Sequence, residues 1–509
     1  MNNSISGVSA YDQASAMRRF FWPIFGAEHK KFLPMTFIIS LVLFNFTILR
    51  NMKDALIVTS CGSELTTFLK FYAVAPSAIL FFVIYSKLSN VFSSQTIFYG
   101  IVTFFLGFFG LFAFVLYPYQ AYFHPIQFAD QLIQAAPRLT QFINMFKFWS
   151  FSIFYVMAEL WGSVVATFLF WQFANSITKV HEAKRFYGHF YLLANLATAL
   201  SGVAAKYFAK LGRQANLADP VATYAITLSY TIGCFIVAGI IVLALYKYMQ
   251  VNVLTDPELV DPNESKPKKS KTKLSFSDSM KVIFSSRYLA MLAIMVFAYG
   301  VTINFVEVSW KNQVKLAFPN PNDYQNFNGD FFFYNGIFTF FIILLGGYVV
   351  RVLGWRIAAL ATPIMIAVTG SAFFAFMIYR EALDPYLMAN FGMGAVLCAV
   401  YLGSVQNILA KSTKYALFDP TKEMAYIPLD NELKSKGKAA VDVIGGRLGK
   451  AGGAGIQQAI ILIYGSLATA TPLIAGLMLI VSLIWIYAVI DLNKLFQAAL
   501  AKKEQEKTA

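Results

Sequence analysis

The sequence predicts an all-α polytopic membrane protein of about twelve transmembrane helices in two six-helix halves. Three observations predict this fold class. The 509 residues are 58% hydrophobic and 13% charged, whereas soluble chains are roughly 45–50% apolar and about 25% charged. Twelve stretches are apolar and long enough to cross a bilayer, which takes about 20 residues. Lysine and arginine gather in alternate connections, as the positive-inside rule requires.

The composition also excludes several classes of protein. A soluble protein with so little charge would expose large apolar patches and aggregate, so the expected partner of this surface is membrane lipid. A disordered chain, a nucleic-acid-binding module and a disulfide scaffold are excluded on the same grounds. In a membrane protein, a net charge of +15 indicates basic cytoplasmic loops rather than a nucleic-acid partner. The cysteines Cys61, Cys234 and Cys398 lie far apart and indicate neither a metal site nor a disulfide framework.

The predicted spans have short connections, which leave no room for a large soluble domain. The twelve spans are 33–58, 70–87, 95–117, 147–173, 187–209, 221–247, 288–310, 331–350, 356–379, 386–411, 439–466 and 470–493. The first 31 residues contain no short apolar run with a cleavage site, so we expect no signal peptide. The segment Arg18–Phe32 fits an amphipathic helix in the membrane interface, and it fits a flexible arm equally well.

The basic residues predict how the spans are oriented. With both termini in the cytoplasm, and residues at span ends counted with the adjacent loop, inside segments hold 28 of the 41 lysines and arginines. Outside segments hold 9, and the remaining four lie within spans. This asymmetry predicts cytoplasmic termini, because one span more or fewer would destroy it.

The strongest break in composition is the charged segment that contains ESKPKKSKTK and follows the sixth span. It predicts an N-terminal six-helix half over 1–248, a basic cytoplasmic linker over 249–282 and a C-terminal six-helix half over 283–509. This layout resembles the major facilitator architecture, in which two six-helix bundles surround a central cavity.

A few ionisable side chains lie inside the predicted spans, where each costs roughly 2.5–3.5 kcal/mol and usually faces a cavity or a partner. They are Arg50, Lys53 and Asp54 in the first span, Glu159 in the fourth, Glu307 in the seventh, and Asp442, Arg447 and Lys450 in the eleventh. Cations around a low-dielectric cavity indicate an anionic substrate. Polyphosphate fits, because guanidinium binds it in forked pairs and ammonium binds it as a point charge.

The eleventh span has two different faces. Gly445, Gly449 and Gly453 recur every four residues, so they form a small-residue face that lets helices approach closely in lipid. Arg447 lies nearly opposite this face, and Lys450 lies 60° from Arg447 at about 100° per residue. We therefore expect one face to pack tightly and the other to present two cations.

Structural roles remain open for each of these charges. Arg447 and Lys450 could neutralise carboxylates or extend to the interface, and Glu159 could be the structural partner of a buried cation. Lys53 could pair with the adjacent Asp54, although neighbouring helical residues point about 100° apart. Glu307 could form a local pair with Lys311, four residues further along the helix.

The sequence shows no catalytic, cofactor-binding or metal-binding motif. GGRLGKAGG differs from a phosphate-binding loop at two positions, Ile444 and Ala451, and it lies in a predicted span. The four histidines lack metal-ligand spacing, and the threefold signature of mitochondrial carriers is missing. We therefore expect no catalytic residues, no cofactor and no metal.

Several long motifs, in order along the chain, resemble the nucleotide transporter family, the ATP:ADP antiporters of obligate intracellular bacteria and plant plastids. They are LRNMKDALIV, AELWGSV, FANSITKVHEAKRFYG, INFVEVSWK, KYALFDPTKEMAYIPLD and KGKAAVDVIGGRLGKAGGAGIQQ. The resemblance covers essentially the whole chain. It implies exchange of ATP for ADP, with both nucleotides as substrates, in the inner membrane of an intracellular bacterium.

The resemblance also implies which charges matter for transport. Four intramembrane charges are held to be critical in this family, and they match Lys53, Glu159, Glu307 and Lys450. Two segments depart from the common pattern: LGKAGGAG replaces LGKSGGAL, and RNMKD replaces RDTKD. Some relatives carry other nucleotides, with or without protons, or NAD. A broader nucleotide or NAD exchanger and a nucleotide–proton symporter are therefore alternatives within the same family.

These residues suggest a hypothesis for the mechanism. The halves rock around a central site in which Lys53 and Lys450, with Arg447, hold the phosphates. Glu159 and Glu307 pair with these cations in the empty carrier, because an unpaired charge in low dielectric is costly. The rival class is a membrane enzyme or lipid flippase that acts on a phosphorylated head group, but no acid–base constellation or metal-ligand set supports it.

Overall fold

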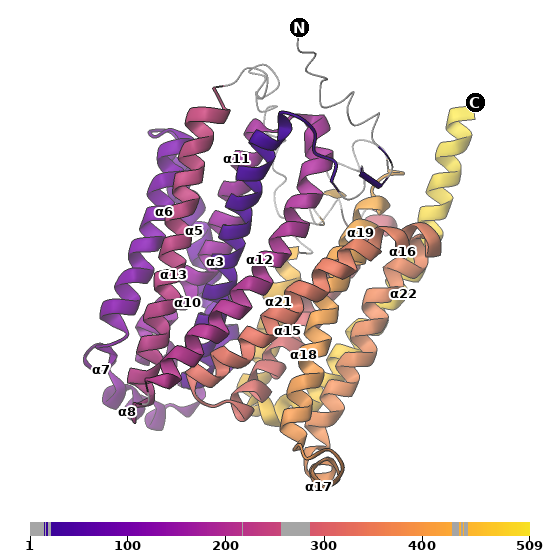
Figure 1. The fold of residues 1–509 in the computed structure, drawn as a ribbon. Coiled ribbons are helices and arrows are strands. Elements are labelled where there is room, and N and C mark those ends of the chain that lie inside the picture. Colours follow the sequence, from indigo (N-terminus) through magenta and orange to yellow (C-terminus); the bar gives the residue numbers. More distant parts are fainter. Residues whose placement is uncertain are drawn as a thin grey trace.

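The computed structural model describes residues 22–215, 217–255, 286–429 and 446–508, together with the short stretches 15, 17–18, 283, 437–438 and 441. These residues form a bundle of long helices, and no strand occurs among them (Figure 1). Helices are the expected solution for a single chain in hydrocarbon, because each helix satisfies its own backbone hydrogen bonds.

The helices between residues 28 and 253 are called the N-terminal group below. Several are continuous rods in which α-helical and π-helical segments alternate. In order, they are α3 (Glu28–Cys61); α4 (Leu65–Phe68), η1 (Leu69–Val74) and α5 (Ala75–Leu88); α6 (Ser94–Leu111) and η2 (Phe112–Leu116); α10 (Trp149–Leu160), η4 (Trp161–Leu169) and α11 (Phe170–Ile177); α12 (Val180–Gln214); and α13 (Pro220–Tyr248) with η5 (Met249–Val253).

The helices between residues 287 and 508 are called the C-terminal group. They are α15 (Arg287–Ala317), α16 (Pro321–Ile378), α18 (Ala395–Thr413) with η6 (Lys414–Phe418) and α19 (Asp419–Ala425), α21 (Gly446–Tyr464) and α22 (Leu467–Thr508). Most of the predicted linker 249–282 lies outside the described residues, and its first five residues continue the sixth span as η5.

Short helices also occur where the sequence does not predict them. The connection after the third predicted span contains α7 (Gln120–Phe123), α8 (Ile126–Ala135), η3 (Pro137–Leu139) and α9 (Thr140–Lys147). A separate helix, α17 (Arg380–Phe391), covers the predicted connection 380–385 and the first residues of the predicted span 386–411, whose long helix α18 begins only at Ala395. α8 and α9 carry apolar residues on one side only, which is typical of helices that lie along a surface rather than cross a membrane.

Several long helices begin where the sequence provides a cap. The side chain of Ser93 accepts a hydrogen bond from the Thr96 backbone at the start of α6. Asp219 and Asn320 cap α13 and α16 in the same way, and each is followed by proline. Proline suits the first helical position, because its missing N–H would have no partner there.

Eleven of the described helical stretches are long and apolar enough to span a membrane, against twelve in the sequence prediction. The remaining predicted span, the eleventh (439–466), is represented by α21, whose apolar stretch covers only Ala451–Tyr464. Its first half is glycine-rich and charged, which lowers its hydropathy. The chain is thus an integral multi-pass membrane protein.

A single backbone break divides α16 into two predicted spans. The helix runs over 58 residues, but Gly354 has φ 76° and ψ 170°. Only glycine adopts this conformation readily. The break lies inside the predicted connection between spans 331–350 and 356–379, so the sequence locates this turn correctly.

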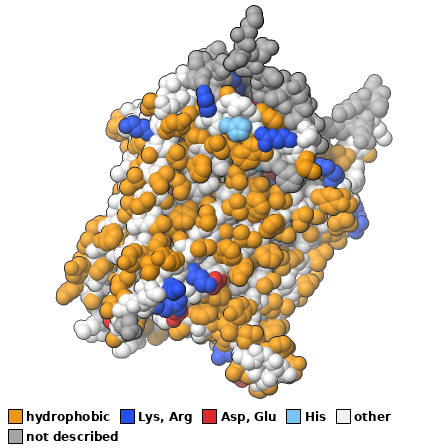
Figure 2. Space-filling view, in the orientation of Figure 1, with side chains coloured by type: hydrophobic (Ala, Val, Ile, Leu, Met, Phe, Trp, Pro, Cys, Tyr) orange, Lys and Arg blue, Asp and Glu red, His pale blue; other side chains and the backbone are white. Residues whose placement is uncertain are grey.

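The outer surface of the bundle is largely apolar. Figure 2 shows hydrophobic side chains covering most of the visible face, with charged side chains gathered mainly toward its upper and lower parts. Exposed phenylalanine, leucine, isoleucine and tyrosine side chains occur on almost every long helix. Such a surface matches lipid as its solvent.

The N-terminal and C-terminal groups lie side by side, with α12 and α16 crossing between them (Figure 1). The start of α3 and the end of α22 lie at one end of the bundle, whereas α7, α8 and α17 lie at the other. The central contacts of α12 and α16 are called the seam below.

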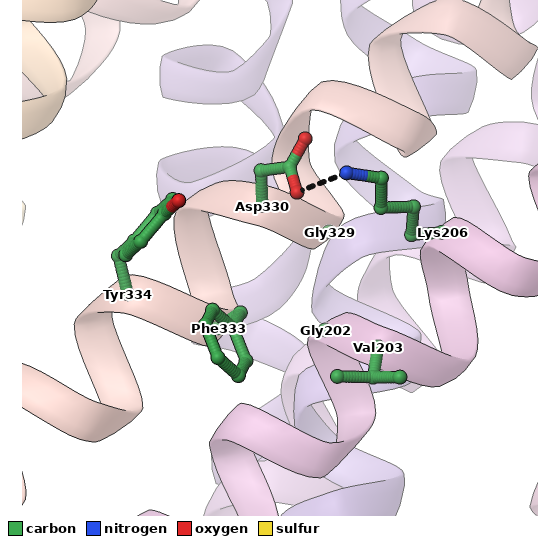
Figure 3. A pocket seen from close by; sticks show the side chains of 7 residues that line it. All are labelled: Gly202, Val203, Lys206, Gly329, Asp330, Phe333 and Tyr334. Atoms are coloured by element: carbon green, nitrogen blue, oxygen red, sulfur yellow. Dashed lines mark hydrogen bonds and ion pairs between the residues drawn. The ribbon is translucent and has the colours of Figure 1, made fainter.

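Glycines bring the two helices of the seam into backbone contact. A Cβ added to Gly202 would lie 2.4 Å from the carbonyl oxygen of Gly329, so neither position has room for a larger side chain. Beside this contact, Lys206 Nζ lies 2.6 Å from Asp330 Oδ1. The two charged side chains line a surface cavity of about 280 Å³ together with Tyr334 (Figure 3). The seam therefore joins the groups by close packing and by an ion pair.

Small residues also bring α21 close to α15. A Cβ on Gly449 would lie 3.0 Å from the carbonyl oxygen of Phe297, and one on Gly453 would lie 2.9 Å from Val301 Cα. The predicted tight face is therefore confirmed at these two positions, whereas Gly445 lies outside the described residues.

Candidate functional site

Helix α3 carries three charged residues on one face. Arg50, Lys53 and Asp54 are separated by three and four positions, which is the spacing of neighbours on a helix surface. The side chains of Lys53 and Asp54 are almost fully buried, at 2% and 4% exposure. These charges sit inside a long apolar helix, so they need partners from other helices.

Lys53 has three partners. Its Nζ lies 2.9 Å from Asp54 Oδ1 and 3.1 Å from Glu159 Oε1. It also lies 4.0 Å from the ring centre of Tyr155, which is within cation–π range. Tyr155 and Glu159 are four residues apart on α10, so one face of that helix provides both contacts.

The second oxygen of Asp54 continues the network into the C-terminal group. Asp54 Oδ2 lies 2.9 Å from Lys311 Nζ on α15. Lys311 Nζ lies 3.5 Å from Glu307 Oε1 on the same helix. The same Glu307 oxygen lies 3.0 Å from Arg50 Nη2, which returns the network to α3. Helices α3 and α15 are therefore joined by two ion pairs.

Together these contacts form one chain of charges, called the ion-pair chain below. Its members are Glu159, Lys53, Asp54, Lys311, Glu307 and Arg50. Buried ion pairs add little net stability compared with apolar packing, whereas removal of one partner costs roughly 3–5 kcal/mol. A chain of six such groups inside an apolar bundle is therefore a candidate functional site rather than a stabilising device.

Two further lysines face the same charges. Lys70, in η1, lies within electrostatic range of Glu307, Lys311, Glu159 and Lys53. Lys411, in α18, lies within range of Arg50, Glu307, Lys311 and Asp54, and its Nζ is 5.0 Å from the ring centre of Phe331. The site thus includes residues from α3, α10, α15, α18 and η1.

The described site carries more positive than negative charge. Its cations are Arg50, Lys53, Lys70, Lys311 and Lys411, and its carboxylates are Asp54, Glu159 and Glu307. Five cations against three carboxylates leave two cations in excess. A site of this kind attracts anions, and its field is strong because the surroundings are apolar.

Three of the site residues lie in or beside π-helical segments. Lys70 is part of η1, Glu159 lies two residues before η4, and Lys411 lies three residues before η6. A π-helical turn widens the backbone ladder and occurs often at functional sites. The local backbone thus distinguishes these positions from the rest of their helices.

The structure brings together three of the predicted site residues. Lys53, Glu159 and Glu307 all belong to the ion-pair chain. The two open local pairs, Lys53 with Asp54 and Glu307 with Lys311, are both present, but each is one link of this larger network. Arg447 and Lys450 lie on α21, and their side chains fall outside the described part of the structure.

Lys70, Lys311 and Lys411 were not predicted as site residues. The sequence places Lys70 and Lys411 at span ends and Lys311 just beyond one, where a lysine normally reaches the interface. The observed helices extend further, to 65–88, 287–317 and 395–425, so all three lysines lie within them. Hydropathy does not predict that these helices continue beyond their apolar segments, so it does not identify these three lysines as site residues.

Comparison with known proteins gives matches along almost the whole chain. The family model described as TLC ATP/ADP transporter matches residues 8–496. ADP,ATP carrier protein 1 of Chlamydia muridarum is 48% identical over 494 residues, covering 96% of this chain and 93% of the relative. The plastidic ATP/ADP-transporter of Solanum tuberosum is 46% identical over 481 residues, covering 94% of this chain and 75% of the relative.

A similar fold also occurs among solved structures. The crystal structure of a bacterial homologue of the iron transporter ferroportin, in its inward-facing state, has a TM-score of 0.50. The alignment covers 94% of this chain and 100% of the other at 16% sequence identity, so the likeness concerns the fold alone. With the all-helical structure, it confirms the predicted all-α, major-facilitator-like fold class.

Proposed function

The chain belongs to the TLC ATP/ADP transporter family, and from this premise we propose that it is a membrane antiporter that exchanges ATP for ADP. It is a transporter rather than an enzyme. The observation that carries the proposal is the ion-pair chain, because it places cations suited to a polyphosphate between the two helix groups. The names of the relatives support ATP and ADP as the substrates.

The ion-pair chain supports a specific role for its carboxylates. In the described structure, Glu159 and Asp54 form ion pairs with Lys53. Glu307 forms ion pairs with Arg50 and Lys311. A bound phosphate chain competes with these carboxylates for the same cations. The carboxylates therefore keep the cations paired while the site is empty, and phosphate replaces them when nucleotide binds.

Arg447 and Lys450 complete the proposed phosphate site. On α21, the glycine face at Gly449 and Gly453 packs against α15. At about 100° per residue, Arg447 lies on the side of α21 away from those glycines. We propose that Lys53, Arg447 and Lys450 hold the phosphates together.

Alternating access explains why exchange is obligatory. The proposed moving units are the halves 1–248 and 283–509, joined by the basic linker 249–282. Each half contributes charged residues to one central site, so rocking of the halves moves the opening from one side to the other. Without nucleotide, the ion pairs between α3 and α15 join the two halves, and breaking them would leave charges unpaired in low dielectric, so the carrier returns with a second nucleotide bound.

The proposed location is the inner membrane of an intracellular bacterium, with both termini in the cytoplasm. The 28 to 9 distribution of basic residues supports this orientation. The start of α3 and the end of α22 lie at the same end of the bundle, as cytoplasmic termini require (Figure 1).

Counter-exchange in proteoliposomes tests the function. Vesicles that contain the full chain are loaded with ADP, ATP, AMP, NAD or no nucleotide, and labelled ATP is added outside. We expect uptake only into vesicles loaded with ADP or ATP. Uptake into unloaded vesicles that stops with an uncoupler would instead establish nucleotide–proton symport, and uptake driven by internal NAD would establish a broader exchanger.

A matched pair of lysine variants links the transport to the site. Lys450→Ala should abolish counter-exchange, because it removes a proposed phosphate ligand. Lys87→Gln should exchange at the wild-type rate, because Lys87 is an exposed residue in the last turn of α5. Normal uptake by Lys450→Ala would contradict the assignment of this lysine.

A further inference from the structure

Two cations of the central site differ from the other three. Arg50, Lys53 and Lys311 each lie within 4 Å of at least one carboxylate oxygen. Within the described ranges of the chain, Lys70 and Lys411 have no such partner, although both lie in range of the same carboxylate, Glu307. They account for the two excess positive charges of the site.

These two lysines come from opposite groups of helices. Lys70 lies in η1, between α4 and α5 of the N-terminal group. Lys411 lies near the end of α18 in the C-terminal group, with its ammonium against the Phe331 ring. Both lie within electrostatic range of Lys311. The segment η1 packs against α10, which carries Glu159, and against α21. Both lysines therefore border the ion-pair chain.

Both lysines are partly exposed, so their ammonium groups are available to an anionic ligand. An ammonium group carries three donors and no acceptor, so it needs an anion or several neutral acceptors when it is partly buried. The ring of Phe331 offers Lys411 a weak electrostatic contact but no acceptor atom comparable to a carboxylate. Lys311, by contrast, is satisfied by Asp54 and Glu307.

We propose that Lys70 and Lys411 form a phosphate-binding pair, one lysine from each half, that receives the phosphate chain of the nucleotide. This inference rests on the proposed function and adds two residues to its site. The ligand class is a linear polyphosphate, because two ammonium groups on different helices suit an extended anion with several charged oxygens.

The pair allows the site to distinguish nucleotides by the number of their phosphates. ATP carries one more phosphate and about one more negative charge than ADP, and AMP carries one fewer phosphate than ADP. A chain long enough to meet both lysines joins the two halves through the ligand.

Binding to the purified full-length protein tests the proposal. Isothermal titration compares ATP, AMP and inorganic tripolyphosphate for the wild type, Lys70→Gln and Lys411→Gln. We expect each variant to bind ATP and tripolyphosphate roughly tenfold more weakly, since a hydrogen bond to a charged group contributes about that factor. AMP affinity should change much less.

Charge-retaining and remote variants exclude a purely structural effect. Lys70→Arg and Lys411→Arg should recover most of the lost affinity, and Lys87→Gln should bind like the wild type. Unchanged tripolyphosphate affinity in both glutamine variants would overturn the proposal, and so would an equal loss for AMP and ATP. Failure of the wild type to exchange ATP for ADP would instead contradict the proposed function, because tripolyphosphate binding does not depend on exchange.

Discussion

Lys53 shows why the charges of the site act as a unit. It is 2% exposed and has two carboxylate partners and one aromatic partner from two helices. Removing its charge leaves Glu159 without its cation, whereas Asp54 retains Lys311. The cost of the change therefore depends on which carboxylate remains charged in the apolar interior.

The first prediction separates stability from transport at this residue. Lys53→Gln should lower the free energy of unfolding by about 1–3 kcal/mol, because it leaves the partly buried Glu159 carboxylate without an ion-pair partner. The double variant Lys53→Gln/Glu159→Gln should regain much of this stability, because both charges are gone. Neither variant should exchange ATP for ADP, since both lack a phosphate ligand. Thermal unfolding in detergent and proteoliposome uptake measure the two effects.

The double variant distinguishes two roles for Lys53. If Lys53 serves only to neutralise Glu159, then removing both charges should restore transport along with stability. Exchange at near the wild-type rate by the double variant would therefore contradict a phosphate-binding role. Lys53→Arg, which keeps the charge, is the control for the loss of charge.

At the residue scale, the sequence predicts part of the site. Charges inside apolar windows are visible by hydropathy, and Lys53, Glu159 and Glu307 were identified in this way. Lys70 and Lys411 stand at the edges of their windows, where snorkelling explains a lysine equally well. Only the observed extension of their helices places them in the site.

At the scale of single helices, α21 packs through small residues. Its glycine face lies against the backbone of α15 between Phe297 and Val301. In lipid, helices associate through close packing rather than a hydrophobic driving force, so this contact has few substitutes. Because α15 also carries Glu307 and Lys311, its packing against α21 affects the geometry of the site.

The second prediction compares two glycines of α21. Gly453→Ala should destabilise the protein by about 1–3 kcal/mol, because the new methyl group would lie 2.9 Å from Val301 Cα. Gly455→Ala should be neutral or slightly stabilising, since nothing lies within 4 Å of its added Cβ. Thermal unfolding of both variants in the same detergent checks the difference.

Equal melting temperatures for the two variants would contradict the packing account of α21. A loss in both variants would indicate a general requirement for helix flexibility. Exchange should follow stability here, because a displaced α21 also shifts Arg447 and Lys450.

Hydropathy predicts elements well where a span is uniformly apolar. The break in α16 was also predicted, because Gly354 lies between two apolar stretches beside Arg351 and Arg356. The helices α8 and α9 were missed, because they are short and not apolar enough for a crossing. The second half of α17 was assigned to the predicted span 386–411. π-helical segments such as η1 have no signature in hydropathy, since they depend on packing around them.

At the scale of the whole molecule, the contacts of the seam hold the N-terminal and C-terminal groups together in the described conformation. Lys206 and Asp330 form an ion pair across it, and Arg213 and Asp323 form another at 3.0 Å (Figure 3 shows the first). Both pairs are partly exposed, so each contributes little stability. The backbone contact at the glycines is the stronger constraint, and alternating access requires that it open.

The third prediction locks the seam with a chemical crosslink. Lys206 and Asp330 form an ion pair across the seam, and both side chains are partly exposed, so a bifunctional thiol reagent can reach cysteines at these positions. The double variant Lys206→Cys/Asp330→Cys is made in a background without Cys61, Cys234 and Cys398. Bridging the two cysteines with a reagent that attaches through disulfides should stop ATP/ADP exchange, and a reductant should restore it.

The two single-cysteine variants control for the substitutions themselves. Each should exchange nucleotide equally well before and after treatment with the reagent. Full exchange by the crosslinked double variant would show that the seam does not open during transport.

The sequence predicts the overall architecture but not its contacts. Span count, the orientation pattern and the position of the linker follow from hydropathy and charge, and the major-facilitator-like fold class is confirmed. The crossing of α12 and α16 is not predictable in this way, because lipid-facing and helix-facing residues are equally apolar. Glycine pairs such as Gly202 and Gly329 become meaningful only when the helices are seen together.

The central claim is that carboxylates form ion pairs with the cations of the site until the phosphates of a bound nucleotide displace these carboxylates. The most direct test is the ATP affinity of Glu159→Gln, measured by titration of the purified protein. Lys53 keeps Asp54 as a partner in this variant, so the fold should survive. The account predicts tighter ATP binding than in the wild type, because the competing carboxylate is gone, together with slower exchange, because release is slower. Weaker ATP binding by a folded Glu159→Gln variant would contradict it.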